Sequence, residues 1–143
     1  MNNPSGHRIE MRYDGLGRVQ SVTQWRRVNG SSVDVATTSY RSYDVFGNLI
    51  AETDGNGKTK QSQFGGFAQL RRAIDEDGRV TSYTYDDFGR ETSQTSVSGK
   101  NIRRAYDEAG HLVEILDLAT GVRTTYGYDI MGHPALIEVM AHR

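Results

Sequence analysis

The sequence predicts an all-β protein, an antiparallel meander of hairpins that forms a strongly curved ribbon. Three observations lead to this fold class. A short turn motif returns at a nearly constant interval, and the stretches between turns alternate in polarity as strands do. In addition, no window carries the 3.6-residue apolar stripe of an amphipathic helix.

The turn motif has the form Tyr-Asp-x-x-Gly. It occurs in five strict copies and in one degenerate copy, Phe64-Gly65-Gly66-Phe67-Ala68. The Tyr, Asp and Gly of the five strict copies are Tyr13, Asp14 and Gly17; Tyr43, Asp44 and Gly47; Tyr85, Asp86 and Gly89; Tyr106, Asp107 and Gly110; and Tyr128, Asp129 and Gly132. The copies begin at residues 13, 43, 64, 85, 106 and 128, so the steps are 30, 21, 21, 21 and 22 residues. A fixed interval indicates a repeat architecture.

The residue types within the motif predict a hairpin turn. An Asp carboxylate accepts backbone N–H groups at the start of a turn, and Gly supplies the positive φ that ends it. We therefore expect a positive φ at Gly89 and Gly110. A second, looser Gly turn lies between successive motifs, at Asp54-Gly55-Asn56-Gly57, Asp75-Glu76-Asp77-Gly78, Ser98-Gly99 and Thr120-Gly121.

Two turns per period leave roughly six or seven residues for each strand, a normal strand length. Six periods then give about twelve strands. The stretch Thr81-Ser82-Tyr83-Thr84-Tyr85 alternates, so both of its tyrosines lie on one face. So many strands rarely stay in one flat open sheet, which is why the ribbon is expected to curve.

The first period is longer than the others. Its extra length holds Val28-Asn29-Gly30-Ser31, and Asn-Gly is a strong signal for a hairpin tip. We expect a longer hairpin that projects beyond its neighbours. Trp25, Arg26 and Arg27 lead into this tip and are candidates for binding a partner, because an exposed Trp beside Arg is typical of interface anchors. The alternative is that Trp25 packs on the ribbon and steadies the hairpin.

Composition excludes several classes. The net charge is −1, which gives no general attraction to nucleic acid, and the absence of cysteine excludes disulfides and Cys-based zinc sites. No apolar run is long enough to span a membrane, and the start, MNNPSGHRIEM, lacks the apolar core of a signal peptide. The hydrophobic share of 36% fits a single sheet with both faces wet.

The motif, followed by a polar residue at about 21-residue spacing, resembles the YD repeat of the Rhs family. Residues 13–19 and 85–90 carry the resemblance most clearly, and it covers roughly residues 9 to 139. It implies a β-ribbon that spirals into a hollow shell, which encloses a toxic C-terminal domain in bacterial Rhs proteins and in the C components of toxin complexes. The related teneurins use a similar shell in adhesion. It implies bacterial, exported or secreted parent proteins.

Family shells need many more repeats than six, so residues 1–143 are expected to be one YD-repeat domain that is a fragment of a larger shell. Its expected partners are the other repeats of that shell and the enclosed cargo. The alternative function is a repeat module that binds carbohydrate or protein. The open strand edges, near residues 9–12 and 135–139, predict self-association, with a two-fold arrangement as the expected closed form. The alternative is that the twelve strands close on themselves and leave no free edge.

The sequence predicts no catalytic residues, no metal site and no cofactor. His111 and His133 follow the motif Gly in neighbouring copies, where other copies have Arg18, Asn48, Gln69 or Arg90, so the position is interpreted as a general polar one. The acidic turns near Asp54 and Asp75 do not match a calcium loop and are interpreted as turn formers. The motif tyrosines are expected to stack on one another across the ribbon as a ladder. The alternative is that they form a sugar site.

Overall fold

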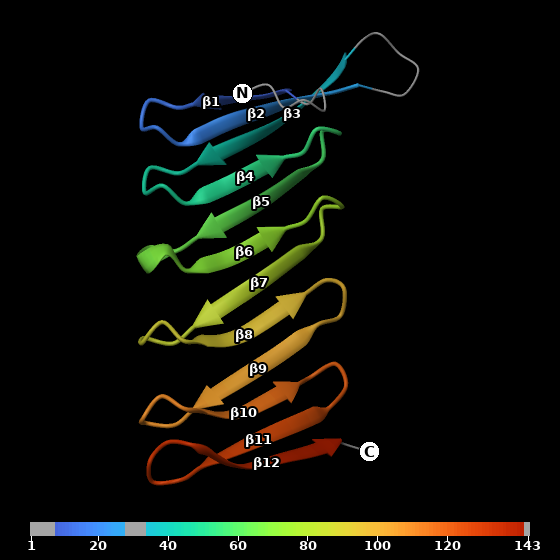
Figure 1. Ribbon diagram of the computed structural model, residues 1–143. Helices are drawn as coiled ribbons and strands as arrows, with labels where there is room; N and C mark the ends of the chain where they lie inside the picture. Colours follow the sequence, from blue (N-terminus) through green and yellow to red (C-terminus); the bar gives the residue numbers. More distant parts are fainter. Residues whose placement is uncertain (1–7, 28–33, 142–143) are drawn as a thin grey trace. The chain divides into compact units, whose positions relative to one another are not determined.

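The computed structural model describes residues 8–27 and 34–141 as an all-β protein (Figure 1). The chain divides into two compact units, Met1–Phe64 with Ile74–Asp77, and Gly65–Ala73 with Gly78–Arg143. The antiparallel meander predicted from the sequence is confirmed, because in each unit the strands follow one another in chain order and pair antiparallel. The curvature of the ribbon stays a prediction.

The first unit holds five strands: β1 (Arg8–Tyr13), β2 (Val19–Arg27), β3 (Asp34–Tyr43), β4 (Leu49–Thr53) and β5 (Thr59–Phe64). The strands β2 and β3 have 9 and 10 residues, and the other described strands have between 5 and 8. The part of β3 before Tyr40 extends past the end of β4, whose last residue, Thr53, pairs with Tyr40. The longer hairpin is therefore confirmed, while its predicted tip at residues 28–31 lies outside the described residues.

The second unit begins with a single 3-10 turn and continues as strands. Its elements are η1 (Gly66–Ala68), β6 (Leu70–Ile74), β7 (Val80–Tyr85), β8 (Glu91–Ser96), β9 (Asn101–Tyr106), β10 (Leu112–Asp117), β11 (Val122–Tyr128) and β12 (Pro134–Ala141). Ile74, the last residue of β6, belongs to the first unit. In Figure 1 the motif turns of β7–β8, β9–β10 and β11–β12 lie at one edge of this unit, and the looser turns lie at the other.

The motif turns have the geometry that their residue types predict. In the first copy the N–H of Gly17 donates to the carbonyl of Asp14 at 3.0 Å, and the N–H of Asp14 donates to the carbonyl of Arg18 at 2.9 Å. Gly89 and Gly110 have φ of 82° and 92°, so the predicted positive φ is confirmed. The strand register shifts by one residue next to the motif Tyr, for example between Thr84 and Tyr85, which is a β-bulge.

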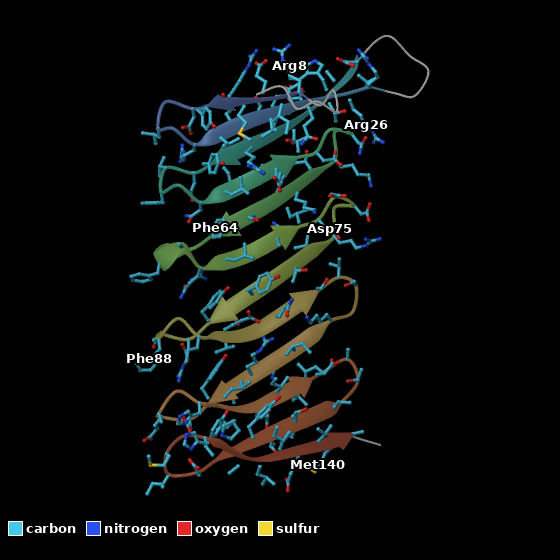
Figure 2. All side chains as sticks on the ribbon, in the orientation of Figure 1. Arg8, Arg26, Phe64, Asp75, Phe88 and Met140 are labelled. Atoms are coloured by element: carbon cyan, nitrogen blue, oxygen red, sulfur yellow. The ribbon has the colours of Figure 1, made fainter. Side chains whose placement is uncertain are left out.

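No buried hydrophobic core exists among the described residues. Ser21, at 8% exposure, is the one buried residue among them, and large apolar side chains such as Phe88 lie in solvent (Figure 2). Hydrophobic burial, the dominant stabilising term in most folds, therefore contributes little here. Backbone ladders and polar contacts between neighbouring strands must hold the sheet together.

Replacing Gly89 by Ala is expected to lower the free energy of unfolding by roughly 1 kcal/mol or more, because an L side chain is strained at positive φ. A Cβ at this position would also lie 3.1 Å from Nε2 of Gln69. Chemical denaturation measures the effect. Gly15→Ala is the matched control, since this glycine has no positive φ and open space around it. Equal stability of both variants would contradict the turn geometry.

In the degenerate copy, introducing a glycine is expected to raise stability. Its turn holds two residues other than glycine at positive φ, Phe67 at 61° and Ala68 at 56°. Ala68 stands where the strict copies have Gly, so Ala68→Gly is expected to stabilise the protein by about 1 kcal/mol. Thermal melting followed by circular dichroism tests this. Ala109→Gly is the control, because Ala109 is not at positive φ and should gain no stability.

Candidate functional site: the clasp between repeats

The motif Asp organises its own turn and the residue that follows the Gly. In the first copy, Oδ1 of Asp14 accepts the N–H groups of Leu16 and Arg18, both at 2.9 Å, and Oδ2 accepts Nε of Arg18 at 2.7 Å. Three donors therefore converge on one carboxylate. The same three donors recur at Asp44 with Asn48, at Asp86 with Arg90 and at Asp129 with His133. Asp107 keeps the two contacts with His111, one from its N–H and one from its ring.

The residue after the motif Gly, which we call the slot residue, reaches across to the next copy. The guanidinium of Arg18 lies over the ring of Tyr43, 4.7 Å from its centroid, and Nη1 donates to the carbonyl of Asp44 at 3.3 Å. Arg90 repeats both contacts with Tyr106 and with the carbonyl of Asp107. The imidazole of His111 stacks on Tyr128 with centroids 4.6 Å apart. A cation or a ring thus covers the face of each of these tyrosines.

The hydroxyl of the motif Tyr completes the connection. Tyr43 donates to the carbonyl of Val19 at 2.9 Å, which is the residue directly after the slot residue of the preceding copy. The same bond recurs from Tyr85 to Leu70, from Tyr106 to Glu91 and from Tyr128 to Leu112, at 2.8 to 2.9 Å. We call the motif Asp, its slot residue and the Tyr of the next copy the repeat clasp.

The ladder of tyrosine on tyrosine predicted from the sequence is wrong for the described residues. Tyr43, Tyr106 and Tyr128 face the slot side chain of the preceding copy instead. Motif tyrosines one period apart are separated by two strands, or about 10 Å, which is too far for ring stacking. The intervening strand places the slot residue in that space.

The degenerate copy keeps half of the clasp. Gly65 takes the place of Asp and offers no carboxylate, and the side chain of Arg71 fills the space where a Cβ of Gly65 would lie. The bond from Tyr85 to the carbonyl of Leu70 is nevertheless present at 2.8 Å. The Tyr half of the clasp therefore forms without the Asp half.

Hydrogen bonds lower the pKa of the motif carboxyls. The N–H of Arg18 is the main cause of the low pKa of Asp14; desolvation opposes it, and the Arg18 side chain adds to it. At Asp86, desolvation is the largest single influence and raises the pKa, but the hydrogen bonds from Arg90 outweigh it. Lowered pKa values are found at Asp14, Asp44, Asp54, Asp86, Asp107, Asp117 and Asp129.

The acidic looser turns of the first unit are held by hydrogen bonds and lysines. Asp54 accepts the N–H groups of Asn56 and Lys58 at 2.9 Å, as its role as a turn former predicts. Nζ of Lys58 lies 3.7 Å from Asp77, and Nζ of Lys60 lies 3.2 Å from Glu76. Across residues 8–27 and 34–141, no three His, Asp or Glu side chains come together as metal ligands would.

The three residues predicted to bind a partner lie at the far end of β2. The guanidinium of Arg8 covers the ring of Trp25 at 4.5 Å from its centroid, and Nε of Arg27 lies 3.5 Å from Asp34. These contacts favour the interpretation in which Trp25 steadies the hairpin. Partner binding by Trp25, Arg26 and Arg27 stays a prediction.

Comparison with known proteins identifies the family of this chain. The RHS Repeat family matches residues 69–100 and 106–139. The chain is 30% identical over 140 residues to the probable deoxyribonuclease RhsB of Dickeya dadantii and 29% identical over 137 residues to RhsA of the same strain, each covering 83% of the chain. The chain belongs to the Rhs family of YD-repeat proteins. It spans about a tenth of the length of both relatives.

The fold of this Rhs-repeat chain is also similar to that of a solved structure. The crystal structure of TcdB2-TccC3 superimposes with a TM-score of 0.72 at 18% identity, over 94% of this chain and 8% of the other. The shared feature is therefore the fold of the repeat ribbon. No helix among the described residues is long and apolar enough to cross a membrane.

The sequence motif contains the Asp and the Tyr of the clasp, but the sequence analysis missed two features of it. It interpreted the slot as a general polar position, although Arg18, Asn48, Gln69, Arg90, His111 and His133 share a side-chain N–H donor. This shared N–H donor is the sequence signal that could have identified the role of the slot residue. The second missed part is the carbonyl after the slot, which carries no side-chain signal at all.

Removing one clasp hydroxyl is expected to cost about 1 kcal/mol of unfolding free energy, since the Glu91 carbonyl then loses its partner. The variant is Tyr106→Phe, measured by chemical denaturation. Tyr40→Phe is the control, because Tyr40 is 56% exposed and its hydroxyl has no hydrogen bond in the described part of the chain. A Tyr106→Phe variant as stable as the control would show that the hydroxyl contributes nothing.

Acid is expected to destabilise the fold through the motif carboxyls. Their folded pKa values lie below the ordinary value of 3.8, so the stability they contribute is fully present above that pH. It is lost as the pH falls through the lowered values. Melting temperatures should drop most steeply below about pH 4. The drop should persist in high salt, because short hydrogen bonds cause it; a flat profile down to pH 2 would contradict the assignment.

Proposed function

We propose that this chain is a wall segment of an Rhs-type shell and that the shell encloses a toxic cargo carried by the parent protein. The observation that carries the proposal is the repeat clasp. Its carboxylates, cations and tyrosine hydroxyls, which elsewhere bind ligands or do chemistry, are engaged within the ribbon: the carboxylate bonds its own turn, the slot Arg bonds the next copy, and the Tyr hydroxyl bonds the preceding copy. The recurring residues therefore join each repeat to its neighbour.

The mechanism is enclosure. Neighbouring strands within each unit are joined by continuous antiparallel ladders, and such a wall leaves no opening that a folded protein could pass. The cargo would be kept from the cytosol until release. The relatives RhsA and RhsB carry the name of probable deoxyribonucleases over much longer chains. In this proposal, catalysis belongs to a cargo outside the repeats, and the repeats themselves are not an enzyme.

Exposed apolar side chains support membership of a larger assembly. The second variable position of the motif turn carries Leu16 and Phe46 in the first unit, and Phe88 and Met131 in the second, each at least 76% exposed. Apolar groups in a row along a turn edge are typical of surfaces that another segment covers. Further repeats of the parent shell would supply that cover.

A chimera tests the proposal. The repeats of Dickeya dadantii RhsB that match this chain are replaced by residues 1–143, and the protein is produced with an active nuclease cargo. We expect the cargo to resist protease and host cells to grow as they do with unmodified RhsB. Cargo digested in the chimera but not in RhsB would contradict the wall function.

The matched control carries Tyr43→Ala, Tyr106→Ala and Tyr128→Ala in the same chimera. These changes remove three clasps, so the wall should open and the cargo should become sensitive to protease. A glycan array with the isolated chain addresses the alternative function. Tight, selective sugar binding by the unaltered chain would favour a carbohydrate-binding module, and its loss in the triple variant would place the sugar at the motif tyrosines.

A further inference from the structure

Four of the slot residues place a side-chain nitrogen beside the motif Gly of the next copy. A Cβ added to that Gly would lie between 3.1 and 3.8 Å from this nitrogen, at Gly47 with Arg18, Gly89 with Gln69, Gly110 with Arg90, and Gly132 with His111. In both Arg copies the same nitrogen, Nη1, also donates to the carbonyl of the next motif Asp at 3.3 Å. An N–H donor at this place therefore joins one copy to the next.

Of these four side chains, His111 is the one whose donor toward the next copy depends on pH. Its Nδ1 lies 3.0 Å from Oδ2 of Asp107. A carboxylate accepts hydrogen bonds, so in the neutral ring the hydrogen is on Nδ1, and Nε2, the atom beside Gly132, offers a lone pair. The guanidinium of Arg and the amide of Gln carry N–H groups throughout this pH range. Neutral His111 thus bonds its own turn but has no donor toward the next copy.

A second proton on the ring supplies what the Arg copies already have. It places an N–H beside Gly132, a positive charge 3.0 Å from the carboxylate of Asp107, and a cation on the face of Tyr128, a residue of β11 whose ring centroid is 4.6 Å away. The side chain of His111 is 35% exposed, so the charged ring stays in contact with water and desolvation opposes the charge only weakly.

The other charged groups of the neighbouring turns are already paired. Arg90, from the preceding copy, bonds the carboxylate of Asp86 at 2.6 Å, which offsets its positive charge. In the following turn, the carboxylate of Asp129 bonds the N–H and the ring of His133. Asp107 is therefore the charged group in direct contact with the ring, and its carboxylate favours the protonated form.

We infer that His111 makes one repeat clasp pH-sensitive: the join between the copies that begin at residues 106 and 128 is tight when the ring carries two protons and looser when it carries one. The inference goes beyond the proposed function, because it concerns the strength of one join and holds whether or not the parent protein forms a shell. Imidazole groups ordinarily change charge between pH 5 and pH 8. Arg18 and Arg90 keep their charge over this range, so their clasps stay unaltered.

The direction of the effect follows from proton binding. In the folded chain the second proton gains Asp107 and Tyr128 as partners, which it lacks in the unfolded chain, so folding takes up the proton. The stability that comes from it is present at low pH and is lost as the pH rises. This effect is opposite in sign to that of the motif carboxyls and lies at higher pH, so the two can be separated.

Chemical denaturation of the full chain at pH 5 and pH 8 tests the inference. The unfolding equilibrium constant of the unaltered chain should rise from pH 5 to pH 8 by roughly three- to tenfold more than that of His111→Gln, in which residue 111 keeps an N–H donor but cannot change charge. The other histidines contribute equally to both proteins and drop out of the comparison. His111→Arg should lack this pH dependence too, and at pH 8 it should be more stable than the unaltered chain.

His133→Gln is the matched control. It makes the same chemical change in the neighbouring slot and leaves the contacts of His111 with Asp107 and Tyr128 in place, so it should retain the pH dependence assigned to His111. NMR titration of the unaltered chain is a second measurement that needs no variant. The ring resonances of Tyr128 should shift together with those of His111.

Two results would overturn the inference. One is an equal response to pH in the unaltered chain and in His111→Gln. The other is an unaltered chain that loses stability at pH 5 relative to His111→Gln, which would mean that the fold prefers the neutral ring. Tyr128 resonances that stay fixed while His111 titrates would equally contradict a change in this clasp.

Discussion

The acceptance of several N–H donors by a single motif carboxylate is the interaction that closes each strict turn and directs its slot side chain. Asp14 receives two backbone donors of its own turn and the side chain of Arg18. The first two close the turn, and the third points Arg18 at the neighbouring copy. Without a buried apolar core among the described residues, nothing else in the turn would give that side chain a single direction.

The slot position shows how one geometry accepts different chemistry. Arg18 and Arg90 contact the next Tyr as cations and also reach a carbonyl, whereas His111 contacts it as a stacked ring. Asn48, which is opposite Phe64 in the continued register, bonds only its own Asp44 among these partners. The slot position therefore requires a side-chain N–H donor that reaches the motif Asp. The rest of the slot side chain differs with the residue that it faces in the next copy.

Most of the fold was open to prediction from the sequence, because turns are encoded locally. Asp and Gly at fixed spacing specify a hairpin turn without reference to distant residues, and regular spacing then dictates a meander. The clasp was not predictable in full. Its acceptors at Val19 and Glu91 are backbone carbonyls, which any residue provides, and the contact of Arg18 with Tyr43 depends on strand register. Register at a bulge is a property of the folded sheet, as the shift between Ser42 and Tyr43 illustrates.

Each clasp reaches only as far as the next copy, and this has a consequence for how such chains change over evolutionary time. In a molecule whose contacts are all between nearest neighbours, stability is close to a sum of local contributions. Duplication or loss of one whole period then moves the junction without disturbing the remaining contacts. Length can vary in steps of one period, whereas an insertion of a few residues inside a strand would put the Tyr of that copy out of step with its carbonyl.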